Sequence, residues 1–295
     1  MDLKSKIILI YGPTASGKSK FAVQLAKKIN GEIINADSMQ VYKELKIISA
    51  RPLQKDSQNI KHHLYGFQYV KKNFSTGDWL KLIDKKILDL RNRKKISILV
   101  GGTGLYFKAL TNGLVNIPNI PISFRAKIRS LHKKLGSKNF FLELVKLDPL
   151  VKNQIKSSDT QRCIRAYEVK LSTNKSIYNW YKNTKSNYEK KDFYKIYVDF
   201  PRNELLNRIN LRAQEMIKMG AVPEVKRFIK LKVPKDKTAN KAIGISEVKE
   251  YLNKKIDIEQ VIEKISIKTR QYAKRQSTWA RGNMQNWNKM NPIQL

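Results

Sequence analysis

Residues Lys6–Ser19, KIILIYGPTASGKS, give the first indication of how this chain folds. Its first part, Lys6–Tyr11, is a short apolar run rich in β-branched residues, which predicts a buried strand. The next part, Gly12–Ser19, matches the pattern G-x-x-x-x-G-K-[ST], and a helical pattern follows as far as Ile29. A strand, a glycine-rich loop and a helix in this order are typical of a phosphate-binding loop.

The composition of this loop explains why it would bind phosphate. Its glycines let successive backbone N–H groups turn towards phosphate oxygens, and the start of the helix adds positive potential. We expect Lys18 to bridge the terminal phosphates and the Ser19 hydroxyl to be a ligand of Mg²⁺. The predicted diphosphate site is the whole loop: Gly12, Pro13, Thr14, Ala15, Ser16, Gly17, Lys18 and Ser19.

Working outward, three more short apolar runs alternate with helical patterns. They are Glu32–Ala36, Ile96–Val100 and Phe193–Val198. Between them, Ser75–Asp78 resembles a capping box that opens a helix. Strands that alternate with helices predict an α/β fold, here a parallel sheet of the P-loop type flanked by helices.

The character of the chain changes at 116–189, where two prolines are followed by helical patterns without a strand candidate. We predict a helical insertion domain at 116–189 and a P-loop core made of 1–115 and 190–295, with helices at its C-terminal end. The helices are expected to end near Gly282, and the tail Asn283–Leu295, rich in Asn, Gln and Met, is expected to be poorly ordered.

Composition limits the class of protein. The 295 residues are 41% apolar, enough for a core, and no window approaches the roughly 18 consecutive apolar residues of a membrane span. The chain has one cysteine and three histidines, which supply neither a disulfide nor a cysteine-rich zinc site, so His62 and His63 are assigned a structural role. No signal-peptide pattern stands at the start, so we expect a cytoplasmic protein. The sequence does not mark an oligomeric state, and a monomer is the default expectation.

Charge points to polyanions. The chain has 60 basic and 24 acidic residues, a formal net charge of +36. This charge favours binding to a polyanion, either nucleic acid or an anionic membrane surface. The alternative is a compositional bias spread over a solvated surface.

An acid follows the second predicted strand and none follows the third. Asp37 comes after Glu32–Ala36, whereas Ile96–Val100 leads into Gly101-Gly102-Thr103. Ligands of parallel sheets bind beyond the carboxyl ends of the strands, so Asp37, Thr103 and the phosphate loop should converge on one crevice. Asp37 is either a general base or a helix cap, and the missing second carboxylate weakens the hydrolase hypothesis without excluding a small-molecule kinase.

Six motifs in order resemble one known family. They are Gly12–Ser19, Asp37–Tyr42 (DSMQVY), His62–Leu64 (HHL), Gly101–Tyr106 (GGTGLY), Asp159–Arg162 (DTQR), and Thr269–Gln276 (TRQYAKRQ) with Thr278-Trp279. Together they resemble the tRNA dimethylallyltransferases, also called tRNA isopentenyltransferases, of the bacterial type. The resemblance covers nearly the whole chain.

The resemblance implies transfer of a dimethylallyl group from dimethylallyl diphosphate, with Mg²⁺, to the exocyclic N6 of the adenosine just 3′ of the anticodon of tRNA. By motif, Asp37 would deprotonate the amine, Thr103 would lie at the reaction centre and Arg212 would contact the donor diphosphate. The base must leave its stack to reach such a crevice.

The resemblance also implies a set of tRNA contacts. They are Asp37, Ser38, Met39, Gln40, Thr103, Arg125, Gln161, Arg162, Cys163, Ile164 and Arg165. A basic face on the last helical pattern, with Lys264, Lys268 and Arg275, suits a phosphate backbone or is simply solvated.

Two residues depart from the family pattern: Ile48 stands at a usual glycine, and Ile245 at a usual aromatic residue after Gly244. Three alternatives remain open at this point. They are a dimethylallyltransferase acting on free adenylate, a P-loop small-molecule kinase, and a non-catalytic RNA-binding module.

Overall fold

The computed structural model of this chain describes residues 6–291. Contacts divide the chain into two compact units, one of Met1–Thr111 with Tyr188–Leu295 and one of Asn112–Asn187. The sequence predicts the second unit at 116–189, so its boundaries lie a few residues earlier at both ends. Each unit has a core of its own.

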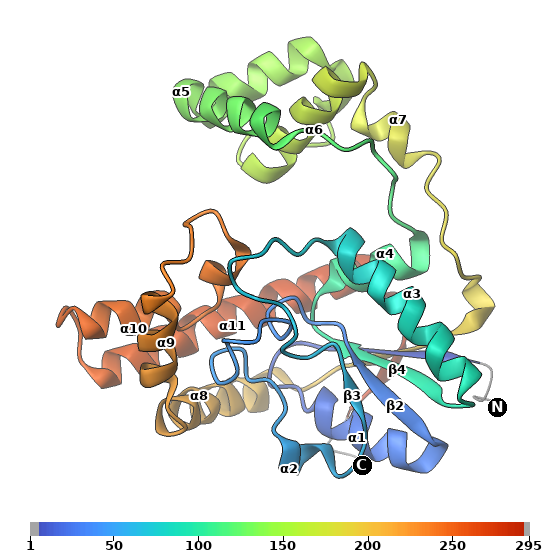
Figure 1. Cartoon of the computed structure of the whole chain (residues 1–295), viewed down its shortest axis with the longest axis vertical. Helices are drawn as coiled ribbons and strands as arrows, with labels where there is room; N and C mark the ends of the chain where they lie inside the picture. Colours follow the sequence, from blue (N-terminus) through green and yellow to red (C-terminus); the bar gives the residue numbers. More distant parts are fainter. Residues whose placement is uncertain (1–5, 292–295) are drawn as a thin grey trace. The chain divides into compact units, whose positions relative to one another are not determined.

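The first unit is built on a parallel sheet (Figure 1). Its strands, in spatial order, are β3 (His62–His63), β2 (Gly31–Asn35), β4 (Ile96–Gly101), β1 (Ile7–Tyr11), β5 (Phe193–Val198) and β6 (Asn288–Met290). The four predicted strands are therefore confirmed, and β5 has the predicted bounds. All neighbouring strands pair in parallel, which brings the loops after β1, β2 and β4 to one edge.

Helices cover both faces of this sheet, which is why every residue of β1 is buried. Ile8 and Ile10 belong to the cluster that packs on α1 (Lys18–Ile29). Leu9 and Tyr11 belong to the cluster on the other face, with α3 (Thr76–Asn92), α4 (Gly104–Asn112) and α11 (Ile258–Asn283). The alternation follows from the two-residue period of a strand.

A local signal accounts for the start of α3. Ser75 caps α3 and accepts the Asp78 N–H, while Asp78 accepts the Ser75 N–H, so the predicted capping box is confirmed. Short elements join the larger ones: α2 (Gln54–Ser57) and three 3-10 turns at Pro149–Val151, Lys190–Asp192 and Thr238–Lys241.

A separate core lies among the C-terminal helices. It joins α8 (Arg202–Lys218), α9 (Ala221–Lys230), α10 (Ile245–Leu252) and α11 to the segment Val41–Ile48. This segment follows β2 and leads towards the carboxyl edge of the sheet, so the C-terminal helices form part of the surroundings of the candidate site.

The tail differs from expectation. Residues 284–291 are ordered: β6 pairs in parallel with β5, Met284 is buried, and Trp287 packs on the core. The prediction of disorder rested on polar composition, which misses an edge strand stabilised by pairing with a neighbour. The remainder of the predicted tail, 292–295, lies outside the described residues.

The second unit is helical, as predicted. It contains α5 (Ile122–Leu147), α6 (Thr160–Thr173) and α7 (Ile177–Tyr181), packed around Phe140, Leu144 and Val169. Gly136 interrupts α5 at φ +73°, and this left-handed residue kinks the helix. Among residues 6–291, no helix combines the length and the apolarity needed to cross a bilayer.

Candidate functional site

The phosphate loop has the geometry that its sequence predicts. Gly17, at φ +82°, turns the chain into α1, and Ala15 also has a positive φ of 64°. A side chain on Gly12 would meet Ser16 Oγ at 2.9 Å and Val198 at 3.0 Å, so the loop has no room for one. Lys18 Nζ donates to the Pro13 carbonyl at 3.1 Å, which folds the ammonium back over the loop.

A residue that the sequence analysis did not single out joins this loop to the next one. The buried amide of Gln276, on α11, accepts the Thr14 N–H at 2.9 Å and donates to the Gly102 carbonyl at 2.9 Å. The Tyr11 hydroxyl donates to the backbone carbonyl of Gln276 at 2.9 Å. Gln276 belongs to the TRQYAKRQ motif, but only the fold shows that it connects the loops after β1 and β4.

Asp37 is held by hydrogen bonds within its own turn. Its N–H donates to Asn35 Oδ1 and its Oδ1 accepts the Met39 N–H, both at 2.9 Å. Thr103 lies behind this turn: its Oγ1 accepts the Ser38 N–H at 2.9 Å and donates to Ser38 Oγ at 3.2 Å. The loops after β2 and β4 are thus joined through Ser38.

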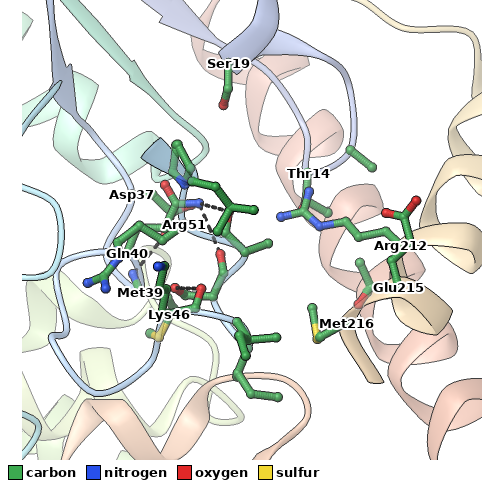
Figure 2. A pocket seen from close by; sticks show the side chains of 18 of the residues that line it. Thr14, Ser19, Asp37, Met39, Gln40, Lys46, Arg51, Arg212, Glu215 and Met216 are labelled. Carbon is green, nitrogen blue, oxygen red and sulfur yellow. Dashed lines mark hydrogen bonds between the residues drawn. The ribbon is translucent and has the colours of Figure 1, made fainter. Parts of the chain in front are cut away.

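A cleft of about 1190 Å³ opens along this edge (Figure 2). Thr14, Lys18 and Ser19 of the phosphate loop line it together with Asp37 and Arg212. In Figure 2, Arg212 reaches inward from α8, opposite the segment that carries Asp37 and Gln40. The predicted meeting of Asp37 with the phosphate loop is therefore confirmed, whereas Thr103 supports the lining from behind.

Charges in the cleft act on one another. Burial lowers the pKa of Lys18 to about 8, a change that Arg212 reinforces and Asp37 opposes. Burial also lowers the pKa of Arg212, again against the opposing charge of Asp37. Two partly desolvated cations facing one carboxylate leave an excess of positive charge, which favours a bound anion.

Tyr272, on α11, also lines the cleft. Burial and the nearby Asp37 carboxylate raise the pKa of its phenol, so it stays neutral and can donate a hydrogen bond.

The end of β4 has no space for a carboxylate. A Cβ on Gly101 would lie 2.0 Å from the Ala36 carbonyl oxygen, and one on Gly102 would lie 2.1 Å from Gln276 Nε2. The absence of an acid at these two positions, noted in the sequence, therefore agrees with close packing against the Ala36 backbone and the Gln276 side chain.

Predicted contacts in the second unit divide into exposed and buried residues. Gln161 and Arg162 are exposed on the first turn of α6, and Arg162 Nε lies 3.4 Å from Asp159 Oδ2. Cys163 and Ile164 lie in the core, at 1% and 9% exposure, so they pack the helix instead of offering side chains to a ligand, contrary to expectation. An i, i+1 neighbour on an amphipathic helix points about 100° away, which a motif comparison does not resolve.

Arg125 and Arg165, the other two arginines predicted to contact tRNA, share one buried carboxylate. Arg125 Nε lies 3.8 Å and Arg165 Nη1 lies 3.4 Å from Glu168 Oε2, and Glu168 is buried. This carboxylate holds both half-buried guanidinium groups in place.

The expected basic face of α11 is partly neutralised. Lys264 Nζ lies 2.6 Å from Glu250 Oε2, and Lys268 forms an ion pair with Glu247. Arg275 lines the cleft, with its guanidinium 5.7 Å from the centre of the Tyr272 ring. The positive charge that reaches the cleft from this helix therefore comes from its later turns.

Metal ligands are few. Within residues 6–291, no three His, Cys, Asp or Glu side chains gather into a metal-binding group. His63 hydrogen-bonds to the buried Glu32 at 2.6 Å, and Glu32 also forms an ion pair with Arg93. These contacts give His63 a structural role in the sheet. Ser19 is exposed in the cleft lining beside Lys18, where a hydroxyl could meet an ion carried by a phosphate.

Known proteins resemble this chain over most of its length. The family model described as IPP transferase matches residues 40–283. The chain belongs to the IPP transferase family. A tRNA dimethylallyltransferase of Pelagibacter ubique is 58% identical over 295 residues, covering 100% of this chain and 94% of the relative. One from Rickettsia massiliae is 43% identical over 283 residues, covering 96% and 78%.

Solved structures of the family have the same fold. A tRNA isopentenylpyrophosphate transferase from Bacillus halodurans is 31% identical, with a TM-score of 0.69 over 97% of this chain and 90% of that chain. A eukaryotic dimethylallyltransferase acting on tRNA is 30% identical, with a TM-score of 0.79 over 93% of this chain and 69% of that one.

The two departures of this IPP transferase from the family pattern lie together. Ile48 and Ile245 are both buried in the core of the C-terminal helices. A Cβ on Gly244 would lie 2.5 Å from Ile48 Cδ1, so Ile48 fills the space above the glycine. Ile245 does not line the cleft, whereas Ile48 forms part of its wall.

Proposed function

We propose that this IPP transferase moves the dimethylallyl group of dimethylallyl diphosphate to the exocyclic N6 of the adenosine immediately 3′ of the anticodon in tRNA. Family membership supports the reaction class. The observation that carries the assignment of roles is that Lys18 and Arg212 face Asp37 across one cleft beside the phosphate loop.

The donor would bind by its diphosphate. The N–H groups of the loop, the Lys18 ammonium and the Arg212 guanidinium would surround its oxygens, and desolvation strengthens each interaction. The same groups would stabilise the charge that grows on the diphosphate as it departs.

Ser19 fits a magnesium ion carried by the donor. Mg²⁺ keeps several waters and takes substrate phosphate oxygens with one or two protein ligands, so a single exposed hydroxyl beside the phosphate loop suffices. When bound, the ion would neutralise charge on the leaving group.

Asp37 would act as the base. In the transfer, adenine N6 bonds to the allyl carbon C1, the bond from C1 to the diphosphate oxygen breaks, and one N6 proton passes to the Asp37 carboxylate. The Met39 N–H fixes Oδ1, which leaves Oδ2 as the proton acceptor. Thr103, through Ser38, would hold this turn in position.

The acceptor would be the anticodon stem-loop, with its adenosine turned out of the stack. The segment Asp37–Gln40 would meet the base, although both Gln40 amide hydrogens already donate to the Ser49 and Ala50 carbonyls. In the second unit, exposed Gln161 and Arg162 and the paired Arg125 and Arg165 suit phosphates or base edges.

One chain supplies the phosphate loop, Asp37 and the cleft, so a monomer is sufficient for the reaction. A single free cysteine, buried at Cys163, suits a reducing compartment, and we place the enzyme in the cytoplasm.

The decisive experiment incubates the protein with dimethylallyl diphosphate, Mg²⁺ and unmodified tRNA, and then analyses the nucleosides by mass spectrometry. The expected product is adenosine heavier by one dimethylallyl group, at the position 3′ of the anticodon. Absence of this product from folded protein would overturn the assignment.

Two parallel reactions test the alternative enzymes. AMP in place of tRNA tests for a free-nucleotide transferase, and labelled ATP tests for phosphoryl transfer. The packing around Gly101 and Gly102 favours the prenyl transferase over the kinase, since it excludes the carboxylate that usually organises Mg²⁺ for nucleotide chemistry.

A further inference from the structure

One wall of the cleft is a loop without regular structure. The segment 46–52 follows the short turn after β2 and contributes every one of its residues to the lining: Lys46, Ile47, Ile48, Ser49, Ala50, Arg51 and Pro52. An irregular segment in such a place needs something to fix it, because its backbone groups have no strand or helix partners.

Glu224 supplies those partners. This buried residue on the first turn of α9 accepts three consecutive backbone N–H groups of the loop. Lys46 N lies 2.9 Å from Oε2, Ile47 N lies 3.0 and 2.9 Å from Oε1 and Oε2, and Ile48 N lies 2.9 Å from Oε1. Three successive N–H groups around one carboxylate form an anion-binding concavity that the protein fills with its own side chain.

This carboxylate is hard to replace. Its position near the start of α9 adds the favourable potential of the helix N-terminus, and hydrogen bonds to a charged acceptor are the strong ones. An amide at the same place would keep one acceptor oxygen and turn N–H donors towards the donors of the loop.

The loop 46–52 is joined to the Asp37 turn by hydrogen bonds from Gln40. Gln40 Nε2 donates to the Ser49 carbonyl at 3.1 Å and to the Ala50 carbonyl at 3.0 Å. Gln40 follows Asp37 closely in the chain, and the Asp37 turn is joined to Thr103 through Ser38. A displaced loop would therefore disturb the side of the cleft that we assign to the acceptor.

The phosphate loop is held separately. Gln276 and the strand β1 fix Thr14 and its neighbours, and none of the contacts of Glu224 reaches them. The donor side should keep its geometry when the wall 46–52 moves.

We infer that Glu224 is a positioning residue that sets the acceptor side of the cleft by holding the wall 46–52. The inference rests on the proposed function for the identity of the acceptor. Glu224 contributes no atom to the reaction, and its role is to orient the Lys46 and Arg51 cations and the Asp37–Gln40 turn.

The test compares Glu224→Gln with Glu32→Gln. Glu32 is a matched control because it is another buried glutamate with charged partners, Arg93 and His63, near the start of β2 and away from the carboxyl edge. For Glu224→Gln we expect the KM for tRNA to rise about tenfold, the factor that ~1.4 kcal/mol gives, with the KM for dimethylallyl diphosphate within about twofold. Glu32→Gln should lower the melting temperature without moving either KM.

A second measurement is independent of activity. Trypsin should cut after Lys46 faster in Glu224→Gln than in Glu32→Gln or in the unaltered protein, detected as a fragment that begins at Ile47. If Glu224→Gln does not fold, Glu224→Asp carries the same test, because it keeps the charge on a shorter side chain.

The outcomes separate the two proposals. Equal rises in both KM values, an unchanged KM for tRNA, or equal resistance to trypsin would overturn the role of Glu224. A protein that is inactive on tRNA but shows the expected change in trypsin cleavage would overturn the proposed acceptor and support the role of Glu224 in holding the wall.

Discussion

Gln276 offers the sharpest test of how the site is assembled. Its amide makes the only described side-chain hydrogen bonds that join the loop after β1 to the loop after β4, to Thr14 N–H and to the Gly102 carbonyl. Replacing it by leucine keeps the approximate volume of the side chain and removes both hydrogen bonds.

The expected loss of stability can be worked out from the burial of the two partners. The Gly102 carbonyl is in buried surroundings, and an unsatisfied buried acceptor costs about 1–3 kcal/mol. Thr14 is half-buried in the cleft lining and water can reach it, so its lost bond costs about 0.5–1.5 kcal/mol. Gln276→Leu should therefore destabilise the protein by about 1.5–4.5 kcal/mol.

Urea unfolding followed by circular dichroism measures this difference in the free energy of unfolding, provided that its slope with urea concentration is the same in both proteins. Dimethylallyl diphosphate should also bind more weakly, because Thr14 lies in the phosphate loop. An unaltered unfolding midpoint would refute the reasoning.

Gln276→Glu refines the test. The ionised carboxylate still accepts the Thr14 N–H but faces the Gly102 carbonyl, so burial and repulsion should raise its pKa. Below that raised pKa the protonated acid donates to the carbonyl, and stability relative to Gln276→Leu should recover as pH falls. If the two variants differed in stability by the same amount at about pH 5 and at about pH 8, the assigned geometry would be contradicted.

Three further predictions follow from the same cleft and sheet edge. Asp37→Asn should lower kcat about 10²–10⁴-fold with little change in the KM for tRNA, and steady-state kinetics showing a change in KM alone would exclude its role as the base. Burial lowers the pKa of Lys18 to about 8. Affinity for dimethylallyl diphosphate should therefore be constant below that pH and fall above it, as the ammonium of the free protein loses its proton. Calorimetric titration between about pH 7 and about pH 10 checks this, and the affinity of Lys18→Arg should not change over that range. Gly101→Ala should cost about 3 kcal/mol, since its Cβ would lie 2.0 Å from the Ala36 carbonyl oxygen. Gly282→Ala, whose Cβ would have nothing within 4 Å, should gain about 0.5–1 kcal/mol, and equal unfolding midpoints for the two variants would count against the close packing at the sheet edge.

Much of the fold could be predicted from local pattern. Continuous apolar runs gave β1, β2, β4 and β5, and the Ser75–Asp78 box gave the start of α3, because these signals act over a few residues. The strands β3 and β6 are only two and three residues long and depend on pairing with β2 and β5, so they left no pattern of their own.

The candidate site divides in the same way. The motifs identified the phosphate loop, Asp37 and Arg212, which the fold brings to one cleft. They did not separate Cys163 and Ile164, which are buried, from Gln161 and Arg162, which are exposed, because neighbours on a helix share a motif but face different surroundings.

Local patterns in the sequence were enough to indicate the phosphate loop, Asp37 and the family motifs. Tertiary structure alone decided how the parts are held, through Gln276 between two loops and Glu224 beneath a third. The physical reason is distance along the chain. A loop or a cap is set by neighbours a few residues away, whereas a buried amide or carboxylate finds its backbone partners only after elements more than a hundred residues apart have packed together.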